Sequence, residues 1–504
     1  MTRCRARDTV PLALLALVLT LGLAGRLEAR EWTQKGFLIG GQGIVHFGDA
    51  AAYRRLNDAG IDLVGAGDTL GYAPLDSALL AARTVLRLRD ADPRFRLRLL
   101  SEVRYPRLRL HQIADHPDPE HHADSLRTTL DSLNRYPSVA GFWLWDEPAD
   151  PDAMRSAARL SRFISRSSAT APLPFVNLLP SYIGDARQRG PRPDAYRLAW
   201  GRDKRSAYAR YLAAYLGQYP DMPAPILSVD HYLFESGSFV WDDYFMTLRA
   251  ATEAAARFGR PGRRIPLWAF VQLSRPRGRA GPGPSLAQVR LAVYGALAYG
   301  ARGIMYWTLV PSHADPGWDD GLLDGLGRPT DKYDAIRRLN AEVHRLGATL
   351  FLLDPVAVLH TALGGQIGIE SDLFANPAHP RTPVAAVANG DSACMVGYLR
   401  DRGRGGDYLL VVNKDVDAPH SFTLRLAGAA DTVYRVSRAT GALVRVGSNL
   451  RSLVVPGLAP GGGELFRIVR ASRVPSPVRG TRPVGGRGAP PPRALRRPSG
   501  RPRA

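Results

Sequence analysis

The chain contains very little cysteine and lysine. Only Cys4 and Cys394 occur among 504 residues. This scarcity excludes a disulfide-rich scaffold and makes a cysteine-based metal site implausible. Lysine occurs only four times, so arginine carries nearly all of the positive charge behind the net value of +21. A hydrophobic content of 45% is ordinary for a folded protein and argues against disorder along the whole chain.

Long apolar runs are absent beyond the N-terminus. Residues 10–24 are almost wholly apolar, and Arg3, Arg5 and Arg7 precede them. The run is shorter than the ~20 residues that span a bilayer, and this pattern is typical of a signal peptide. We therefore predict a signal peptide over residues 1–29 and a secreted or periplasmic protein. The alternative is an uncleaved membrane anchor.

The C-terminal end lacks acidic residues and apolar periodicity. Residues 471–504 contain nine arginines and are rich in proline and glycine. This composition predicts a disordered basic tail. Such a tail would be able to contact an anionic polymer or a membrane surface, and no motif points to a specific nucleic-acid partner.

One pattern repeats between residues 36 and 353: a short β-rich apolar run and then a segment with helical spacing. The predicted strands are 36–44, 61–67, 96–105, 139–145, 174–179, 225–232, 266–273 and 303–309. The predicted helices are 49–59, 77–89, 121–134, 152–165, 206–216, 241–258, 286–299 and 332–346. Eight such units predict an α/β fold, a (β/α)₈ TIM barrel.

An open doubly wound sheet is the structural alternative to the barrel. It would often carry a glycine-rich phosphate turn after the first strand. Gly41-Gln42-Gly43 begins such a turn, but His46 stands where a third glycine is needed. Residues 354–470 differ from the barrel, because their short strands are punctuated by Gly, Asp and Pro. They predict a C-terminal all-β sandwich domain.

Function in such a barrel belongs to the carboxyl ends of the strands and the loops that follow them. The polar and aromatic residues at these predicted ends are Gln42, His46, Asp68, Glu102, Arg104, Tyr105, Asp146, Glu147, Asn177, Tyr182, Asp230, His231, Tyr232, Gln272, Tyr306 and Trp307. Carboxylates, amides and aromatic rings together suit a sugar, because its hydroxyls need hydrogen-bond partners and its C–H faces pack on flat rings.

The fourth predicted strand runs directly into two acids. Val139–Trp145 is apolar, and Asp146-Glu147-Pro148 follows it. Two adjacent carboxylates after such a run are costly unless they face a polar cleft. The alternative is that they cap the next helix or bind a loop arginine. This segment resembles the Asn-Glu-Pro motif at the end of strand four in the retaining (β/α)₈ glycoside hydrolases.

The resemblance implies a carbohydrate substrate, with Glu147 as the catalytic acid/base. No cofactor is expected, and no metal site is expected because the eleven histidines form no close-spaced helical pair with an acid between them. Asp146 stands where the family usually has asparagine. The family also places a nucleophilic glutamate at the end of strand seven, where this chain has Gln272. The second catalytic carboxylate is therefore expected elsewhere. Asp230 is the first choice, ahead of Glu102 and Glu235.

Other strand-end residues are expected to bind the sugar. They are Trp145, Asp146, Asn177, His231, Tyr232, Gln272, Tyr306, Trp307 and Glu102. An aromatic side chain at a strand end can equally be packing at the barrel cap. The main hypothesis is a secreted glycoside hydrolase, and the alternative is a non-catalytic carbohydrate-binding or envelope scaffold protein on the same fold. Arginines 263, 264, 275, 277 and 279 flank the seventh strand and would suit an acidic sugar, although loop arginines are usually solvated.

Overall fold

A computed structural model describes most of the chain between residues 31 and 470. The described residues are 31–43, 46–66, 74–102, 104–105, 108–109, 123–167, 170–184, 199–200, 204–233, 241–277, 283–311, 318–319, 321–364, 369–388 and 391–470. The predicted signal peptide and basic tail lie outside them, as do Asp68 and Glu235. No described helix combines the length and apolarity needed to cross a membrane.

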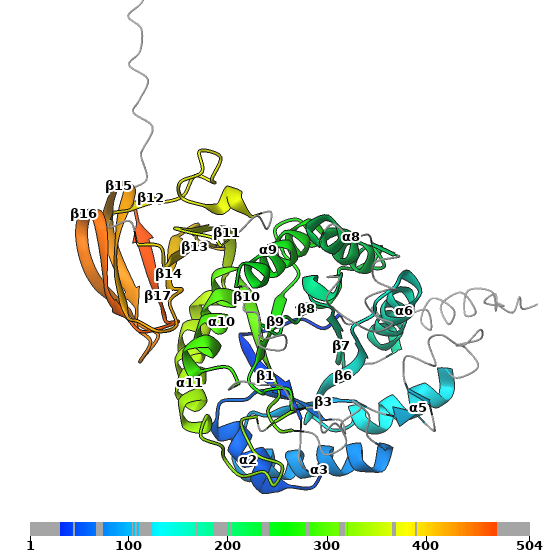
Figure 1. Ribbon diagram of the computed structural model, residues 1–504. Coiled ribbons are helices and arrows are strands. Elements are labelled where there is room, and N and C mark those ends of the chain that lie inside the picture. The colour runs from blue at the N-terminus through cyan, green and yellow to red at the C-terminus, as the bar shows by residue number, and fades with distance from the viewer. Residues whose placement is uncertain are drawn as a thin grey trace, which may run out of the picture. The chain divides into compact units, whose positions relative to one another are not determined.

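Eight parallel strands close into a barrel, with the helices around its outside (Figure 1). The strands are β1 (Leu38–Gln42), β2 (Leu63–Ala66), β3 (Arg98–Ser101), β6 (Val139–Asp146), β7 (Leu173–Leu178), β8 (Leu227–Val229), β9 (Leu267–Gln272) and β10 (Ala301–Trp307). Pairing of β1 with β10, with Leu38 opposite Gly303, completes the ring. The predicted barrel is confirmed, and the alternative of an open sheet is wrong.

The predicted helices are present within a few residues of their expected ends. They are α2 (Ala50–Asp58), α3 (Leu75–Ala91), α5 (Ala123–Asn134), α6 (Pro151–Ser167), α8 (Lys204–Leu216), α9 (Trp241–Arg257), α10 (Leu286–Ala298) and α11 (Tyr333–Leu350). Side-chain caps define the N-terminal ends of two of these helices, α2 and α10. The Asp49 side chain accepts hydrogen bonds from the first turn of α2, and Ser285 and Gln288 form a capping box on α10.

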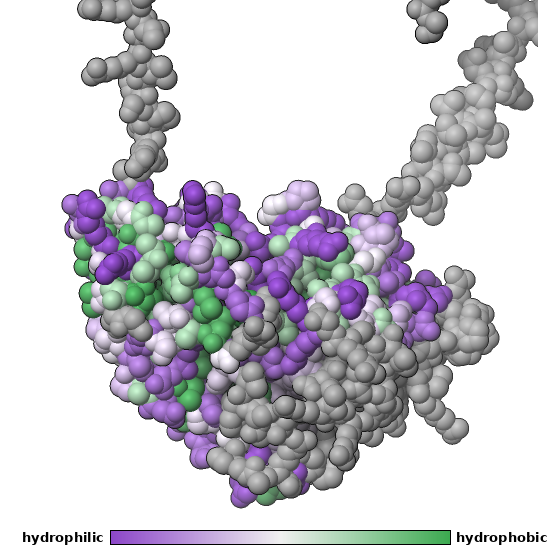
Figure 2. Space-filling view, turned by 45° about the horizontal axis from the view of Figure 1, so that its top comes forward, coloured by the Kyte–Doolittle hydropathy of each residue, from purple (hydrophilic) through white to green (hydrophobic). Residues whose placement is uncertain are grey.

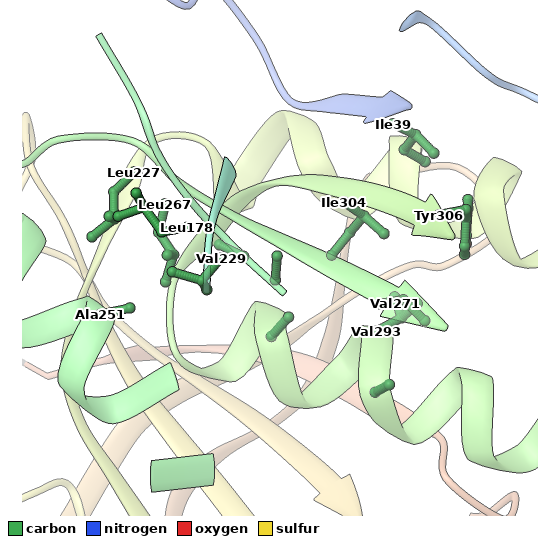
Figure 3. Packing of buried hydrophobic residues seen from close by; sticks show 14 of the residues in the cluster. Ile39, Leu178, Leu227, Val229, Ala251, Leu267, Val271, Val293, Ile304 and Tyr306 are labelled. Carbon is green, nitrogen blue, oxygen red and sulfur yellow. The ribbon is translucent and has the colours of Figure 1, made fainter. Parts of the chain in front are cut away.

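Successive side chains of each strand point to opposite sides of the barrel wall. Outward residues such as Val229 and Val271 pack against α9 and α10, and Figure 3 shows part of this layer. Inward residues, including Trp143 and Phe175, fill the barrel interior. Gly303 has no side chain, because a Cβ there would lie 2.7 Å from the Trp268 ring. The same alternation decides which residues at the carboxyl ends face inward.

The predicted β domain is also present. Its strands are β11 (Leu353–His360), β12 (Val384–Val387), β13 (Cys394–Asp401), β14 (Asp407–Asn413), β15 (His420–Val436), β16 (Leu443–Leu458) and β17 (Gly463–Val469). All seven belong to one curled antiparallel sheet that surrounds a core of its own. Its two longest strands, β15 and β16, each replace two short predicted strands. The third barrel strand is shorter than expected, and a separate ribbon of β4 (Arg104–Tyr105) and β5 (Leu108–Arg109) follows it.

The curled sheet also packs against the barrel, through buried side chains of β14. Along β14, Leu409 and Val411 pack into the core of the sheet, whereas Leu410 and Val412 belong to the core of the barrel. Helix α10 contacts this second face of β14. The sheet is therefore packed on the barrel through one of its own faces.

Candidate active site at the carboxyl ends of the barrel strands

Polar residues from most of the barrel strands face the interior at one end. The alternation of each strand and the pairing register place Gln42, Glu102, Asp146, Asn177, Asp230, Tyr232, Gln272 and Trp307 on this inner ring. All eight were expected from the sequence at strand ends. The end of the barrel on which they lie is the one that carries function in this fold.

A β-bulge in β6 selects which acid faces inward. Trp143 pairs with Phe175, but the next pairing joins Trp145 to Val176, so Leu144 is an extra residue. A bulge of this kind re-aims the side chains that follow it. Asp146 therefore takes the inward place opposite Asn177. Trp145 packs against the outer hydrophobic cluster and not on the inner ring.

Glu147 has an unusual backbone conformation directly after the bulge. Its φ angle is 56°, in the left-handed region that non-glycine residues seldom adopt. Its N–H donates a hydrogen bond of 2.9 Å to the Asn177 carbonyl, which holds the chain in this turn. A residue with this backbone strain persists only where the surrounding structure holds it in place, and such residues are concentrated at functional sites. The strain thus singles out the residue that the sequence motif indicates as catalytic.

Asn177 joins two acids from neighbouring strands. Its Nδ2 donates to Asp146 Oδ1 at 3.3 Å and to Asp230 Oδ2 at 3.0 Å. The Ser228 hydroxyl donates to Asn177 Oδ1 at 3.0 Å, which defines the orientation of the amide. Both polar ends of this side chain are therefore occupied by protein groups. The Asn177 amide thus donates to protein carboxylates; the sequence predicts either a carboxylate or a sugar hydroxyl as its acceptor.

Asp230 is a buried acid of the inner ring with a strongly raised pKa. Its side chain is buried, with only 2% of the residue exposed. Burial raises the pKa of Asp230 well above its ordinary value, and the negative charges of Glu147 and Asp146 and a side-chain hydrogen bond with Glu147 raise it further. The carboxyl groups of Asp230 and Glu147 are therefore within hydrogen-bonding reach. We call Asp146, Glu147 and Asp230 the acid cluster.

Two further residues of the ring are also buried. Glu102 is 1% exposed and accepts a hydrogen bond of 3.4 Å from Gln42 Nε2. It has room because Gly65 lacks a side chain, since a Cβ there would lie 3.1 Å from Glu102 Oε1. Gln272 donates to the Ser274 carbonyl at 3.1 Å. No group of three or more metal-binding side chains that could hold an ion occurs among the described residues.

An aromatic cluster lies beside the acids. Tyr232 stacks on Trp307 with ring centres 5.8 Å apart, and Trp318 meets both rings edge-on at 5.9 and 5.6 Å. The prediction placed Tyr232 and Trp307 at this end of the barrel but missed Trp318. Trp318 lies in the loop after β10, where no strand periodicity points to it. Burial and the charge of Asp230 raise the pKa of Tyr232, so it remains a neutral phenol.

Two of the expected substrate-binding residues point away from the barrel interior. The Tyr306 hydroxyl donates to Asn340 of α11 at 2.7 Å, and its ring lies in the outer layer (Figure 3). His231 lies 2.9 Å from the hydroxyl of Thr247 of α9, and burial lowers its pKa to about 3. Both side chains pack between strands and helices, because each stands one residue out of phase with an inward neighbour.

Sequence comparisons identify no relatives for this chain. No protein-family model matches it, and no curated protein matches it. Solved structures with a similar chain path include a β-galactosidase from Bacillus circulans sp. alkalophilus, with 11% identity, a TM-score of 0.45, and coverage of 86% of this chain and 99% of that chain.

Two other similar structures are a family 51 α-L-arabinofuranosidase and an endo-β-1,4-mannanase. The arabinofuranosidase, from Bifidobacterium longum, has 10% identity and a TM-score of 0.39, with 83% of this chain and 89% of that chain covered. The mannanase, from Cellulomonas fimi, has 14% identity and a TM-score of 0.36, with 86% and 93% covered. These values carry no argument about activity, which rests on the site itself.

Proposed function

We propose that this protein is a glycoside hydrolase that acts on its substrate at the inner ring of the barrel. The observation that carries the proposal is the meeting of Glu147 and Asp230, which come from different strands and are within hydrogen-bonding reach of each other. A carboxyl pair of this kind, with Asp230 buried, shares a proton, because two neighbouring like charges cannot both ionise easily. A proton held in this way at neutral pH is what the departure of a sugar oxygen requires.

The close contact also changes the role expected for Asp230. A carboxyl group that interacts with Glu147 and holds a proton is not free to act as a nucleophile or a base. We therefore assign Asp230 the task of holding the proton on the pair. Glu102, the other buried carboxylate of the ring, becomes the candidate base.

In the proposed reaction, Glu147 gives its proton to the departing glycosidic oxygen as the C–O bond breaks. A water molecule adds to the sugar carbon, and the proton that it loses goes to Glu102. Both carboxyl groups of the pair are then ionised, and the proton that Glu102 gained returns to the pair through solvent before the next turnover. The rings of Tyr232, Trp307 and Trp318 would pack against the C–H face of the sugar.

Carbohydrate binding without turnover is the second candidate function. One specific observation favours it: Gln272, which is not a nucleophile, stands at the end of β9, where the resembled family has its second glutamate. In that case the acid cluster would only hydrogen-bond sugar hydroxyls.

A panel of glycans separates the two candidates. Wild-type protein and Glu147→Gln would be tested for binding and for release of reducing ends, with Glu253→Gln as the control because Glu253 lies on α9 in an ion pair with Arg249. The enzyme proposal expects turnover by wild type and the control, and a loss of about 10²–10⁴-fold in Glu147→Gln. Binding by all three proteins with turnover by none would support the second candidate.

We also propose that the protein is exported, on the strength of the apolar stretch over residues 10–24. Cell fractionation of the full-length chain tests this directly. Recovery of a shortened protein outside the cytoplasm is the expected result, and a full-length protein retained inside the cell would contradict it.

A further inference from the structure

Of the three rings in the aromatic cluster, Trp318 lies farthest along the chain from a barrel strand. It follows Trp307, the last residue of β10, by eleven positions, whereas Tyr232 follows the end of β8 by three. A connection of eleven residues does not by itself fix a side chain, because each residue adds conformational freedom. Trp318 nevertheless meets Tyr232 and Trp307 edge-on, with ring centres 5.9 and 5.6 Å apart. Other contacts must therefore hold it there.

The loop after β9 supplies such contacts. Pro276 and Trp318 form an antiparallel β-bridge, and the Asp319 N–H donates a hydrogen bond of 2.7 Å to the Arg275 carbonyl. The Asp319 carboxylate accepts from Arg275 Nε at 2.6 Å, and Arg277 Nε lies 3.4 Å from its other oxygen. Backbone and side-chain contacts of Trp318 and its neighbour Asp319 thus tie the tryptophan to the β9 loop.

The start of the β9 loop is itself fixed to the end of β10. The N–H groups of Leu273 and Ser274 donate to the Trp307 carbonyl at 2.7 and 3.1 Å. The Ser274 hydroxyl also lies 2.9 Å from the hydroxyl of Thr308. Arg275, the next residue, therefore shares one hydrogen-bonded frame with Trp307. A residue that is bound to Arg275 keeps its place relative to the Trp307 ring.

The ion pair between Arg275 and Asp319 lies too near the surface to contribute much to folding. The two side chains are 40% and 30% exposed, and solvent screens the attraction between charges in such a place. The planar guanidinium nevertheless orients the carboxylate that it binds. Its main effect is therefore expected on the position of Trp318 and not on stability. Trp318 is half-buried, so part of its surface remains accessible to a ligand.

We propose that Arg275 and Asp319 are positioning residues that hold Trp318 as one wall of an aromatic corner for a sugar. The plane of Trp318 is inclined by 84° to Trp307 and by 69° to Tyr232, and these two rings stack on each other. A sugar in this corner packs its C–H groups against two aromatic surfaces at once. The inference rests on carbohydrate as the ligand of the proposed site, but it does not require turnover.

Near-ultraviolet circular dichroism of the ligand-free, full-length protein tests the positioning role directly, because it reports on the packing of aromatic side chains. The proteins are wild type, Trp318→Ala, Asp319→Asn and the conservative variant Asp319→Glu. Asp334→Asn is the matched control, since Asp334 forms an exposed ion pair with Arg337 at 3.2 Å on α11. We expect Asp319→Asn to shift the spectrum toward that of Trp318→Ala, Asp319→Glu to remain closer to wild type, and the control to be unchanged.

Affinity is measured by calorimetric titration of the same proteins, with soluble oligosaccharides of glucose, mannose, galactose and arabinose as probes. We expect Trp318→Ala and Asp319→Asn each to weaken binding of the best probe by about tenfold. The double variant should bind no more weakly than Trp318→Ala, because Asp319 acts through Trp318. Where the probe is hydrolysed, KM should rise by the same factor and kcat should stay within about threefold of wild type, since the wall contacts substrate and transition state alike.

Affinity and turnover distinguish this proposal from the hydrolase proposal. A wild type that binds a probe without hydrolysing it would contradict the hydrolase, while a loss of affinity in Asp319→Asn would still support the positioning role. Thermal melts of every variant would confirm that the fold is retained. The positioning role is overturned if Asp319→Asn keeps the wild-type spectrum and affinity, if the double variant binds more weakly than Trp318→Ala, or if wild type binds none of the probes.

Discussion

Glu147 combines the proposed catalytic carboxyl with a left-handed backbone, and the two properties can be separated by substitution. Glycine adopts this conformation freely, whereas glutamine retains the strain. Both changes remove the negative charge beside Asp230. We expect Glu147→Gly to be more stable than Glu147→Gln by about 1 kcal/mol, although both lose activity. Chemical denaturation of the two variants measures the difference. Equal stability would show that the backbone at this position is not strained.

Asn177 is predicted to control the protonation of the acid cluster. Its hydrogen bond to Asp230 lowers the pKa of that carboxyl, against the raising effects of burial and neighbouring charge. Asn177→Ala removes this donor, so the pKa of Asp230 should rise further, and the alkaline limb of the profile of kcat/KM against pH, where the pair loses its proton, should move to higher pH. Ser228→Ala, which only frees the amide, should shift the limb less. An unchanged profile in Asn177→Ala would contradict this positioning role.

Among the elements, β6 shows which features of the site could be predicted from sequence. Its apolar run is long and uninterrupted, so the strand and its terminal acids are evident from the residues alone. The bulge at Leu144 is not, because it depends on how β6 pairs with β7. One extra residue exchanges the directions of Trp145 and Asp146, so Trp145 packs on the outer cluster and Asp146 faces inward. Tyr306 and His231 were expected at the strand ends as substrate-binding residues, but their side chains point outward toward the helices. The sequence prediction did not assign the inward or outward direction of each strand residue.

At the start of β15, His420 forms hydrogen bonds to two carboxylates, and the strength of this interaction depends on pH. Its Nδ1 lies 2.6 Å from Asp391 Oδ2 and its Nε2 lies 2.9 Å from Asp415 Oδ2. Both partners are carboxylates, so both ring nitrogens donate and the ring is protonated. These two hydrogen bonds raise the pKa of His420 above its ordinary value. Its stabilising effect is therefore complete below the unfolded pKa of about 6.5 and is lost as the pH rises through the raised folded value.

We expect His420→Gln to lower the free energy of unfolding more at pH 5.5 than at pH 9.5. Denaturant titrations of wild type and variant at the two pH values provide the test. His379→Gln is the matched control, because the hydrogen bond of His379 is to a backbone carbonyl and not to a carboxylate. A penalty that is equal at both pH values would show that the charged ring contributes nothing specific.

At the scale of the whole molecule, the barrel and the curled sheet are predicted to depend on one another. A Cβ at Gly463 of β17 would lie 2.4 Å from the Tyr294 ring of α10. Gly463→Ala should therefore destabilise the protein by about 1–3 kcal/mol, because a buried ring and a strand must separate. Gly406→Ala is the control, since its nearest neighbour would be at 3.6 Å. Equal melting temperatures for the two variants would contradict a shared interface.

The surface of the described chain carries both kinds of residue, and Figure 2 shows hydrophobic ones among hydrophilic ones. Exposed apolar side chains on β16 include Leu443, Val444 and Val454. Single exposed residues of this kind are common in folded proteins, so they reveal little about function. Hydropathy along the sequence predicted the barrel and the β domain because buried strands and helices carry periodic apolar residues.

The residues of the candidate site were predictable to different degrees. Glu147, Asp230 and Trp307 follow from strand ends, because parallel strands of one barrel bring those ends together. The contact between Glu147 and Asp230 and the double donation by Asn177 are not predictable from spacing. They depend on the stagger of three neighbouring strands, which only the closed barrel defines.

The central claim is that Glu147 and Asp230 act as one proton-sharing pair. The most direct test is to measure kcat for wild type, Glu147→Gln, Asp230→Asn and the double variant on the best substrate from the glycan panel. Residues that act as a unit are strongly non-additive. We predict that each single change lowers kcat by about 10²–10⁴-fold and that the double variant is no slower than the slower single variant. Effects that multiply in the double variant, or a single variant with wild-type turnover, would contradict the account.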